Sequence, residues 1–233
     1  MRVAALIPAY QAAPYLGDVL ARLAALPEPP EALVVDDGSR DATAEVARQF
    51  GARVHSFAGN RGKGFALITG FRLLRHVDAV VTLDADGQHP PECVPDLIRA
   101  AADADVVLGT RLRTGSMPML RRLANWSSSA WTSGLAGQRI SDSQCGFRLF
   151  RREVLERTPI TPGRYEVETE MAVRTARLGF RIAEVAIPTV YGGESHLTLH
   201  RDVPRILAVM GRLTLERLAP PRAMRDALRG GVR

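Results

Sequence analysis

The alternation of short apolar runs with longer amphipathic segments is the strongest constraint on how this chain can fold. Five runs have the length and composition of buried strands, and the four segments between them carry apolar residues at helical spacing. The expected strands are 3–8, 31–39, 53–57, 79–83 and 104–111, and the expected helices are 14–26, 41–50, 62–76 and 91–102. We expect Asp41 to cap the second helix. Strands that alternate with helices through short loops predict an α/β fold with a mostly parallel, doubly wound sheet.

The regular alternation of strands and helices ends after residue 111. We expect a loop at 113–120, a helix at 121–137, a strand that continues into a helix over 146–155, a helix at 167–180 and a strand at 181–191. The domain organisation is then a main domain over residues 1–200, followed by an arginine-rich amphipathic helix and tail over 201–233. Such a helix suits an anionic membrane surface. Packing against its own domain is the simpler alternative.

Composition limits the choice of partners. The chain has 233 residues, enough for one large α/β domain or a domain with an appendage. Its formal charge is +6, and almost all of its positive charge is arginine, because Lys63 is the only lysine. This balance favours a nucleotide, a lipid phosphate or a membrane surface, although an arginine-biased genome gives the same composition. The arginines are dispersed and no nucleic-acid-binding motif is present, so we expect no nucleic-acid partner.

The cysteines and the hydropathy pattern bear on location. Cys93 and Cys145 have no motif spacing and no nearby histidine in sequence, so we expect reduced core thiols. The N-terminus lacks the layout of a secretory signal. No uninterrupted apolar run approaches the ~18 residues of a membrane-spanning helix. These features predict a cytoplasmic protein, at most peripheral on the cytoplasmic face of a membrane.

The segment LDADGQHPP, residues 83–91, carries the first candidate site. Asp84, Asp86 and Gln88 follow an apolar strand at alternate positions, so three oxygen donors lie at its carboxyl end. Such donors suit Mg²⁺ or Mn²⁺, which keep coordination positions open for substrate phosphates. An isolated Asp-x-Asp can also simply end a strand in solvent.

Two further motifs fall at the same edge of the expected sheet. VVDDGS places Asp36 and Asp37 at the end of the second strand, where carboxylates bind ribose or base groups or stabilise a turn. The segment 59–64, GNRGKG, opens the third helix, and its backbone N–H groups, with Lys63 or Arg61, suit a phosphate. It is not a Walker A loop, because the spacing and the terminal Ser or Thr are absent. Together these strand ends predict a metal and diphosphate site.

The chain resembles the family 2 glycosyltransferases of the GT-A fold, and among them the polyprenyl-phosphate sugar synthases, such as dolichyl-phosphate mannose and glucose synthases. The motifs that carry the resemblance are IPAYQ, VVDDGSRDAT, NRGKGFALITGF, LDADGQHPPE, GTR, DSQCGFRLF, ETEM and IPTVYGGESH, which span nearly all of residues 3–200. The resemblance implies inverting transfer of a sugar from a nucleotide sugar, such as GDP-mannose or UDP-glucose, to a polyprenyl phosphate. The implied cofactor is Mg²⁺ or Mn²⁺.

The resemblance also implies roles for individual residues. The nucleotide sugar would be held by Pro8, Ala9, Tyr10, Asp36, Asp37, Lys63 and Asp84, and the metal by Asp84, Asp86 and Gln88. The catalytic set would be Asp86, Arg111, Arg121, Arg122 and Arg148, in which Arg111 and Arg121 or Arg122 bind the acceptor phosphate. Gln11-Ala12 stands where family members commonly have Asn-Glu, which puts one nucleoside contact in question. Several relatives also carry transmembrane helices after the catalytic domain, and no such segment is found here.

Other polar and aromatic residues are expected to be less directly involved. Glu166, Glu168 and Glu170 form an acidic cluster that would supply a general base for a hydroxyl acceptor, but we expect solvent-facing or arginine-orienting roles. The lone histidines are expected at the surface or in loops, and the tryptophans in the core; they are His89, His196, His200, Trp126 and Trp131.

Two other enzyme classes fit parts of the pattern. A GT-A glycosyltransferase acting on a hydroxyl acceptor, on a saccharide or small molecule, would share the donor site. A nucleotidyltransferase also uses an α/β sheet with paired aspartates, but the early Gly-rich signature expected of that class is absent. A phosphate acceptor is largely ionised near neutral pH, so it needs positive charge more than a general base. The arginines favour that acceptor.

Overall fold

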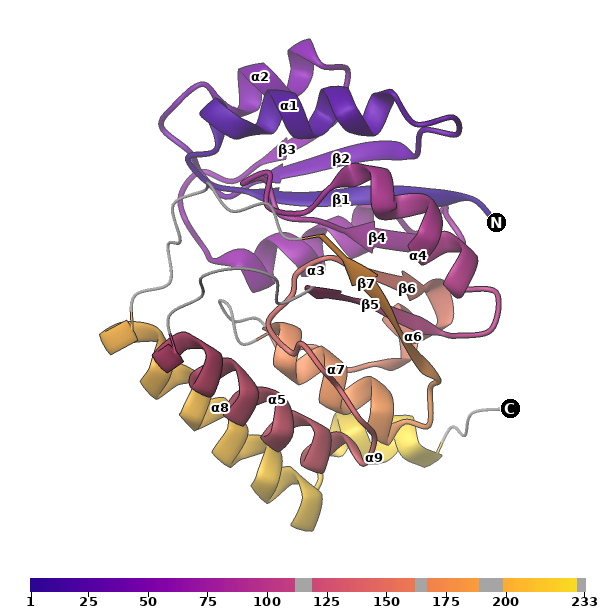
Figure 1. Ribbon diagram of the computed structural model, residues 1–233, viewed down its shortest axis with the longest axis vertical. Helices are drawn as coiled ribbons and strands as arrows, with labels where there is room; N and C mark the ends of the chain where they lie inside the picture. The colour runs from indigo at the N-terminus through magenta and orange to yellow at the C-terminus, as the bar shows by residue number, and fades with distance from the viewer. Residues whose placement is uncertain (112–118, 162–166, 189–198, 230–233) are drawn as a thin grey trace.

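The chain folds around one seven-stranded sheet with the order β3-β2-β1-β4-β6-β5-β7, seen in a computed structural model (Figure 1). The structure describes residues 1–111, 119–161, 167–188 and 199–229, and for 119–126 and 199–207 it describes the backbone alone. The strands are β1 (Val3–Ala9), β2 (Glu31–Asp36), β3 (Arg53–Ser56), β4 (Ala79–Thr82), β5 (Val106–Arg111), β6 (Arg148–Arg151) and β7 (Ile182–Ile187).

The helices follow the expected order. They are α1 (Ala13–Ala24), α2 (Thr43–Gln49), α3 (Lys63–Leu73), α4 (Val94–Ala100), α5 (Met119–Ala136), α6 (Arg152–Arg157), α7 (Val167–Arg177), α8 (Leu199–Leu218) and α9 (Arg222–Arg229), with a short 3₁₀ turn at Pro91–Cys93. The predicted α/β class and mostly parallel sheet are confirmed, and β6 is the antiparallel strand, between β4 and β5. The predicted cap of α2 is wrong by one position, because Ala42 occupies the N-cap. Asp41 still accepts a hydrogen bond from the Thr43 N–H.

The topology locates the site. The chain runs from β1 outward to β2 and β3, then returns to place β4 on the other side of β1. Strands β1 and β4 are parallel, so their carboxyl ends lie at the same edge of the sheet. In open α/β sheets this reversal of strand order leaves a crevice at the carboxyl ends, where ligands bind. The segments that follow β1 and β4 therefore face one another across the expected binding edge.

Alternate residues of β1 point to opposite faces of the sheet and join separate cores. Ala5 and Ile7 pack in the core formed with α1 and α4, whereas Ala4 and Leu6 pack in the core formed with α3, α6 and α7. Both sets are fully buried, as the two-residue period of a strand covered on both faces requires.

Helices α5, α7 and α8 form a further layer. Figure 1 shows α5 and α8 side by side, at the opposite end of the molecule from α1 and α2. Leu135, Val173 and Leu213 of these three helices form a small buried cluster. Next to it, Arg174 pairs with Glu170 and with Glu216, the latter at 2.7 Å. Packing against the domain is thus the arrangement observed for the described part of α8.

Apolar residues at the end of α8 do not all join this packing. Leu215 and Leu218 are 67% and 83% exposed, and α9 places Met224 in the core while Arg222 and Arg225 are exposed. Within the described ranges, no helix is both long and apolar enough to cross a bilayer.

Gly70 provides a test of the α3 packing. A Cβ at this position would lie 2.2 Å from Leu6 Cδ1, and Leu6 is fully buried. We expect Gly70→Ala to lower the free energy of unfolding by about 1–3 kcal/mol, the usual cost of overpacking a core, in urea denaturation. The control is Gly134→Ala in α5, where a Cβ meets nothing within 4 Å. That change should stabilise the helix by up to about 1 kcal/mol. Equal effects of the two substitutions would contradict this account of α3.

Candidate active site

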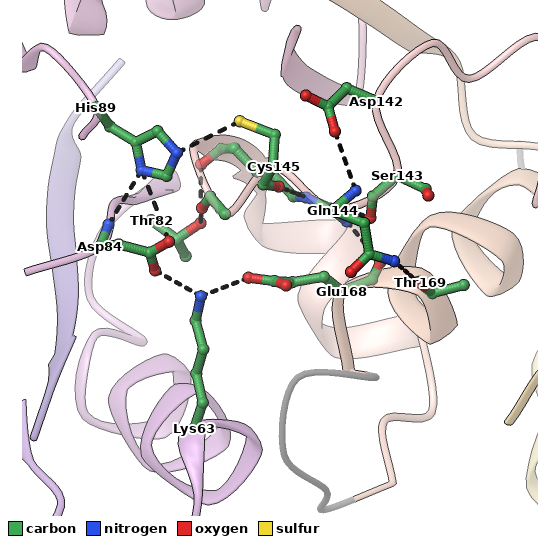
Figure 2. A network of polar contacts seen from close by, with 12 residues as sticks. Lys63, Thr82, Asp84, His89, Asp142, Ser143, Gln144, Cys145, Glu168 and Thr169 are labelled. Atoms are coloured by element: carbon green, nitrogen blue, oxygen red, sulfur yellow. Dashed lines mark hydrogen bonds and ion pairs between the residues drawn. The ribbon is translucent and has the colours of Figure 1, made fainter. Parts of the chain in front are cut away.

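A buried lysine joins two carboxylates at the crevice between β1 and β4. Lys63 is the first residue of α3, and its Nζ donates to Asp84 Oδ1 at 2.5 Å and to Glu168 Oε1 at 2.5 Å. Asp84 lies just beyond β4, and Glu168 lies in the first turn of α7 (Figure 2). The three side chains are 16%, 27% and 7% exposed, in the order lysine, aspartate, glutamate. This contact connects segments 21 and 105 residues away from the lysine along the chain.

Lys63 and Asp84 each stabilise the charged form of the other. Burial alone would lower the pKa of Lys63, but the charges of Asp84 and Glu168 outweigh it and raise that pKa. Burial would likewise raise the pKa of Asp84, and the ammonium of Lys63 reverses the shift. Both groups are therefore charged at neutral pH.

Gly146 makes room for the two carboxylates. A Cβ at this position would lie 2.7 Å from Asp84 Oδ2 and 2.9 Å from Glu168 Oε1. Only a glycine allows both acidic side chains to approach the backbone at this point. The Gly146 carbonyl also accepts a hydrogen bond from Thr82 Oγ1 at 2.8 Å, which fixes this loop to β4.

His89 lies in the loop after β4, behind Asp84, so the loop position expected for it is confirmed and the surface position is wrong. It is 4% exposed, stacks on Phe147, and its Nδ1 accepts a hydrogen bond from the Asp84 N–H. Its Nε2 lies 3.6 Å from Cys145 Sγ, so this cysteine has a histidine partner in space that the sequence did not reveal. Burial lowers the pKa of His89 despite the nearby aspartates. Cys93 and Cys145 are both free thiols, as expected.

Arg111 is held by a carboxylate that the sequence analysis did not single out. Its Nε and Nη2 donate to the two oxygens of Asp142 at 2.7 and 2.9 Å, and its side chain is 23% exposed. Burial would raise the pKa of Asp142, but the hydrogen bonds from Arg111 hold it below its usual value. Asp142 is the first residue of the DSQCGFRLF segment, and this acidic residue ahead of the Gly-Phe-Arg sequence was the feature by which it could have been found in the sequence.

Arg148 lies in the core and not at the surface of the site. It is 1% exposed, and its guanidinium donates to the backbone carbonyls of Ser143, Cys145 and Glu168. Each of its three nitrogens donates to a backbone carbonyl, so Arg148 joins the loop before β6 to the start of α7, and the direct catalytic role implied by the resemblance stays a prediction.

The two aspartates at the end of β2 stabilise the loops around them. Both oxygens of Asp37 accept backbone hydrogen bonds, from the N–H groups of Arg61 at 2.7 Å and Gly62 at 2.8 Å. Asp36 Oδ1 accepts a bond from the Ser39 N–H at 2.9 Å. Gly62 has φ +97°, a conformation that favours glycine. The turn chemistry considered for these residues is thus present, and Asp37 fixes the Gly-rich turn that precedes Lys63.

Pro8 and Ala9 complete β1, and Tyr10 follows it with 47% of its surface exposed. Gln11, at φ +51°, accepts backbone hydrogen bonds from Arg40 and Asp41 through its side-chain oxygen. This residue therefore joins the loop after β1 to the loop before α2.

Asp84, Asp86 and Gln88, the predicted cation ligands, lie just beyond β4. Asp86 Oδ1 accepts a hydrogen bond from the Gln88 N–H at 3.0 Å, and Asp84 keeps Oδ2 free of the lysine. Among the described residues, no three His, Cys, Asp or Glu side chains gather closely enough to hold a metal. Two carboxylates and an amide fit a hard divalent cation that takes its remaining ligands from phosphates and water.

Several residues considered in the sequence fall outside the described side chains. They are Arg121, Arg122, Trp126, Glu166, His196 and His200. Within the acidic cluster, Glu168 and Glu170 are buried and not solvent-facing. Glu170 pairs with Arg174 and Arg212, in agreement with the arginine-orienting role. Trp131 is 43% exposed, so the expectation of a core position is wrong for this residue.

Sequence comparisons connect this geometry to known proteins. The model for glycosyl transferase family 2 matches residues 4–158. An undecaprenyl-phosphate mannosyltransferase from Micrococcus luteus is 38% identical over 205 residues, which cover 82% of this chain and 84% of the relative. A dolichyl-phosphate hexose transferase from Haloferax volcanii is 35% identical, over 74% of this chain and 76% of the relative.

Solved structures share the fold. A glucosyl-3-phosphoglycerate synthase from Mycobacterium tuberculosis, crystallised with Mn²⁺, UDP and glucosyl-3-phosphoglycerate, superposes with a TM-score of 0.75 at 23% identity, covering 94% of this chain and 81% of that one. A mannosyl-3-phosphoglycerate synthase from Rubrobacter xylanophilus gives 0.70, also at 23% identity, with 94% and 74% covered. The protein is therefore a glycosyltransferase that belongs to glycosyl transferase family 2 and has the GT-A fold.

Proposed function

We propose that the protein transfers a sugar, with inversion, from a nucleotide sugar to a polyprenyl phosphate, in a reaction that depends on Mg²⁺ or Mn²⁺. The observation that carries this proposal is the arrangement of charge at one edge of the sheet. Acidic oxygens of Asp84 and Asp86 lie at the end of β4, and the arginine of β5, Arg111, is fixed near them by Asp142. The acidic part suits a cation and donor diphosphate, and the basic part suits an acceptor phosphate.

The relatives' names support the acceptor class. Both curated relatives described above are named as transferases that act on a polyprenyl or dolichyl phosphate. The names differ in the sugar that is moved, so we propose the acceptor class and leave the donor to the assay below.

Each group has a defined part in the proposed reaction. A bound divalent cation would neutralise the charge that develops on the departing nucleoside diphosphate. Asp84, Asp86 and Gln88 would hold that cation, while Pro8, Ala9, Tyr10, Asp36 and Asp37 would enclose the nucleoside. Arg111, with Arg121 or Arg122, would bring the acceptor phosphate towards the anomeric carbon and offset its charge. The acceptor oxygen is already ionised, so no proton has to be removed.

A hydroxyl acceptor is the second candidate, favoured by the carboxylate of Glu168 at the site. Its Oε1 is bound by Lys63 and lies beside Gly146, so this oxygen is already engaged in an ion pair. This arrangement supports the phosphate acceptor over the hydroxyl acceptor.

We also propose that the end of α8 contacts an anionic membrane, where a polyprenyl phosphate would reside. Leu215 and Leu218 are largely exposed there, and the following helix exposes Arg222 and Arg225. Exposed leucines beside arginines match the apolar boundary and the charged headgroups of such a surface. The cytoplasmic face is the side we propose, because the two cysteines are free thiols, as is usual in a reducing compartment.

The reaction class is tested by supplying Mn²⁺ or Mg²⁺ and labelled UDP- and GDP-sugars, with and without polyprenyl phosphate, and counting label extracted into organic solvent. We expect label from one donor, dependent on lipid phosphate. Asp86→Ala should reduce it by about 10³-fold or more, because a cation ligand is lost. Asp96→Ala, on the exposed face of α4, is the control and should leave it unchanged. Metal-dependent donor hydrolysis without lipid label would instead favour a hydroxyl acceptor.

The acceptor arginines are tested by Arg121→Ala combined with Arg122→Ala. We expect the KM for polyprenyl phosphate to rise about tenfold or more, since charged hydrogen bonds to phosphate are lost, while donor binding stays the same. Arg48→Ala with Arg99→Ala removes two exposed arginines elsewhere and should change neither quantity. A loss of donor affinity in the first variant would show that these arginines serve the donor.

Membrane contact is tested by sedimentation with vesicles of phosphatidylglycerol and phosphatidylcholine. Leu215→Ser with Leu218→Ser should weaken the partition about tenfold or more, because two apolar side chains no longer leave water. Binding by the unaltered protein should also fall at high salt. Tyr15→Ser, which changes an exposed residue of α1, is the control. Equal binding by all three proteins would rule out this surface.

A further inference from the structure

We propose that Lys63 is an internal counter-cation that limits how tightly Asp84 binds a divalent ion, and that Glu168 sets the strength of this effect. The inference rests on the proposed role of Asp84 as a metal ligand. It adds two residues, Lys63 and Glu168, that determine metal affinity without contacting the metal.

The geometry places one positive charge between two acidic groups. Lys63 Nζ is equally close, at 2.5 Å, to an oxygen of Asp84 and an oxygen of Glu168 (Figure 2). Both carboxylates also converge on Gly146, where an added Cβ would lie within 2.9 Å of each. Without the ammonium, two partly buried carboxylates would face one another around this glycine. Lys63 therefore occupies the position at which a cation would be most strongly attracted.

The position of the lysine is fixed from its own side of the site. It begins α3 directly after Gly62, whose N–H, with that of Arg61, is bound by the carboxylate of Asp37. This turn fixes the backbone from which the side chain extends, and the contacts with Asp84 and Glu168 hold the ammonium at its end. A divalent ion at Asp84 is consequently repelled by a nearby fixed positive charge.

Glu168 determines how much of that positive charge acts on Asp84. Its carboxylate shares the ammonium, and its backbone carbonyl is fixed by Arg148, so it does not shift readily. If its charge is removed, the ammonium remains with Asp84 alone and repels a metal more strongly. If the ammonium is removed, both carboxylates attract the metal. The two substitutions should therefore change metal affinity in opposite directions.

A biological consequence follows from the charge balance. A divalent ion gains little at this site until a diphosphate adds further negative charge beside it. Lys63 thereby makes tight metal binding depend on the nucleotide.

The test measures Mn²⁺ binding to the purified full chain by electron paramagnetic resonance of free Mn²⁺, with no nucleotide and then with UDP or GDP. We expect Lys63→Met to increase Mn²⁺ affinity without nucleotide about tenfold, and Glu168→Gln to reduce it severalfold. The double variant should lie between them. Glu92→Gln makes the same change at an exposed glutamate that pairs with Arg22, and should have no effect.

The outcomes separate this inference from the proposed function. If the unaltered protein binds Mn²⁺ with nucleotide but Lys63→Met and Glu168→Gln leave the affinity unchanged or shift it the same way, this inference is overturned and the metal-dependent reaction stands. If the unaltered protein binds no Mn²⁺ even with nucleotide, the metal role of Asp84 fails and the inference fails with it. If Lys63→Met does not fold, Glu168→Gln still tests the inference, because this change keeps the size of the side chain and removes only its charge. Unchanged or tighter Mn²⁺ binding by Glu168→Gln would then overturn the inference.

Discussion

The buried guanidinium of Arg148 is the interaction on which the second half of the site depends. Arg148 is the first residue of the antiparallel strand β6. Its guanidinium donates to the carbonyls of Ser143 and Cys145, in the loop before β6, and to the carbonyl of Glu168, in α7. Each hydrogen bond from a charged donor contributes roughly 1.5–3 kcal/mol, so together they fix the loop before β6 against the start of α7. Asp142 lies on that loop and Glu168 on that helix, and these acidic groups bind Arg111 and Lys63.

The active-site charges are thus arranged in two fixed groups. The first is Lys63 with the carboxylates of Asp84 and Glu168, at the acidic end of the crevice, and the second is the ion pair of Arg111 with Asp142. Both are partly buried, where charge interactions are stronger than in water. A preorganised arrangement of this kind does not have to reorient when charge moves from the sugar to the diphosphate, which is the main electrostatic requirement of the proposed reaction.

Helix α8 both packs against the domain and exposes apolar residues at its end. The ionic contacts of Arg174 and the buried Leu213 attach α8 to α7, the helix that carries Glu168. The end of the same helix exposes Leu215 and Leu218. A surface that contacts lipid would therefore be joined through a single helix to the acidic group that binds Lys63, which places acceptor delivery and the donor site on connected parts of the structure.

The sequence by itself determined the α/β class, the order of the elements and the edge at which the site lies. These follow from local periodicity and from residues adjacent in sequence, as with Asp84 and Asp86 after β4. Only the tertiary structure placed β6 antiparallel between β4 and β5, turned Arg148 into the core, buried His89 behind Asp84, and brought Glu168 to Lys63 across 105 residues. Those features depend on which distant groups share a buried space, because a buried charge or polar group must find a partner there. The spacing of residues along the sequence does not indicate which distant residue will be that partner.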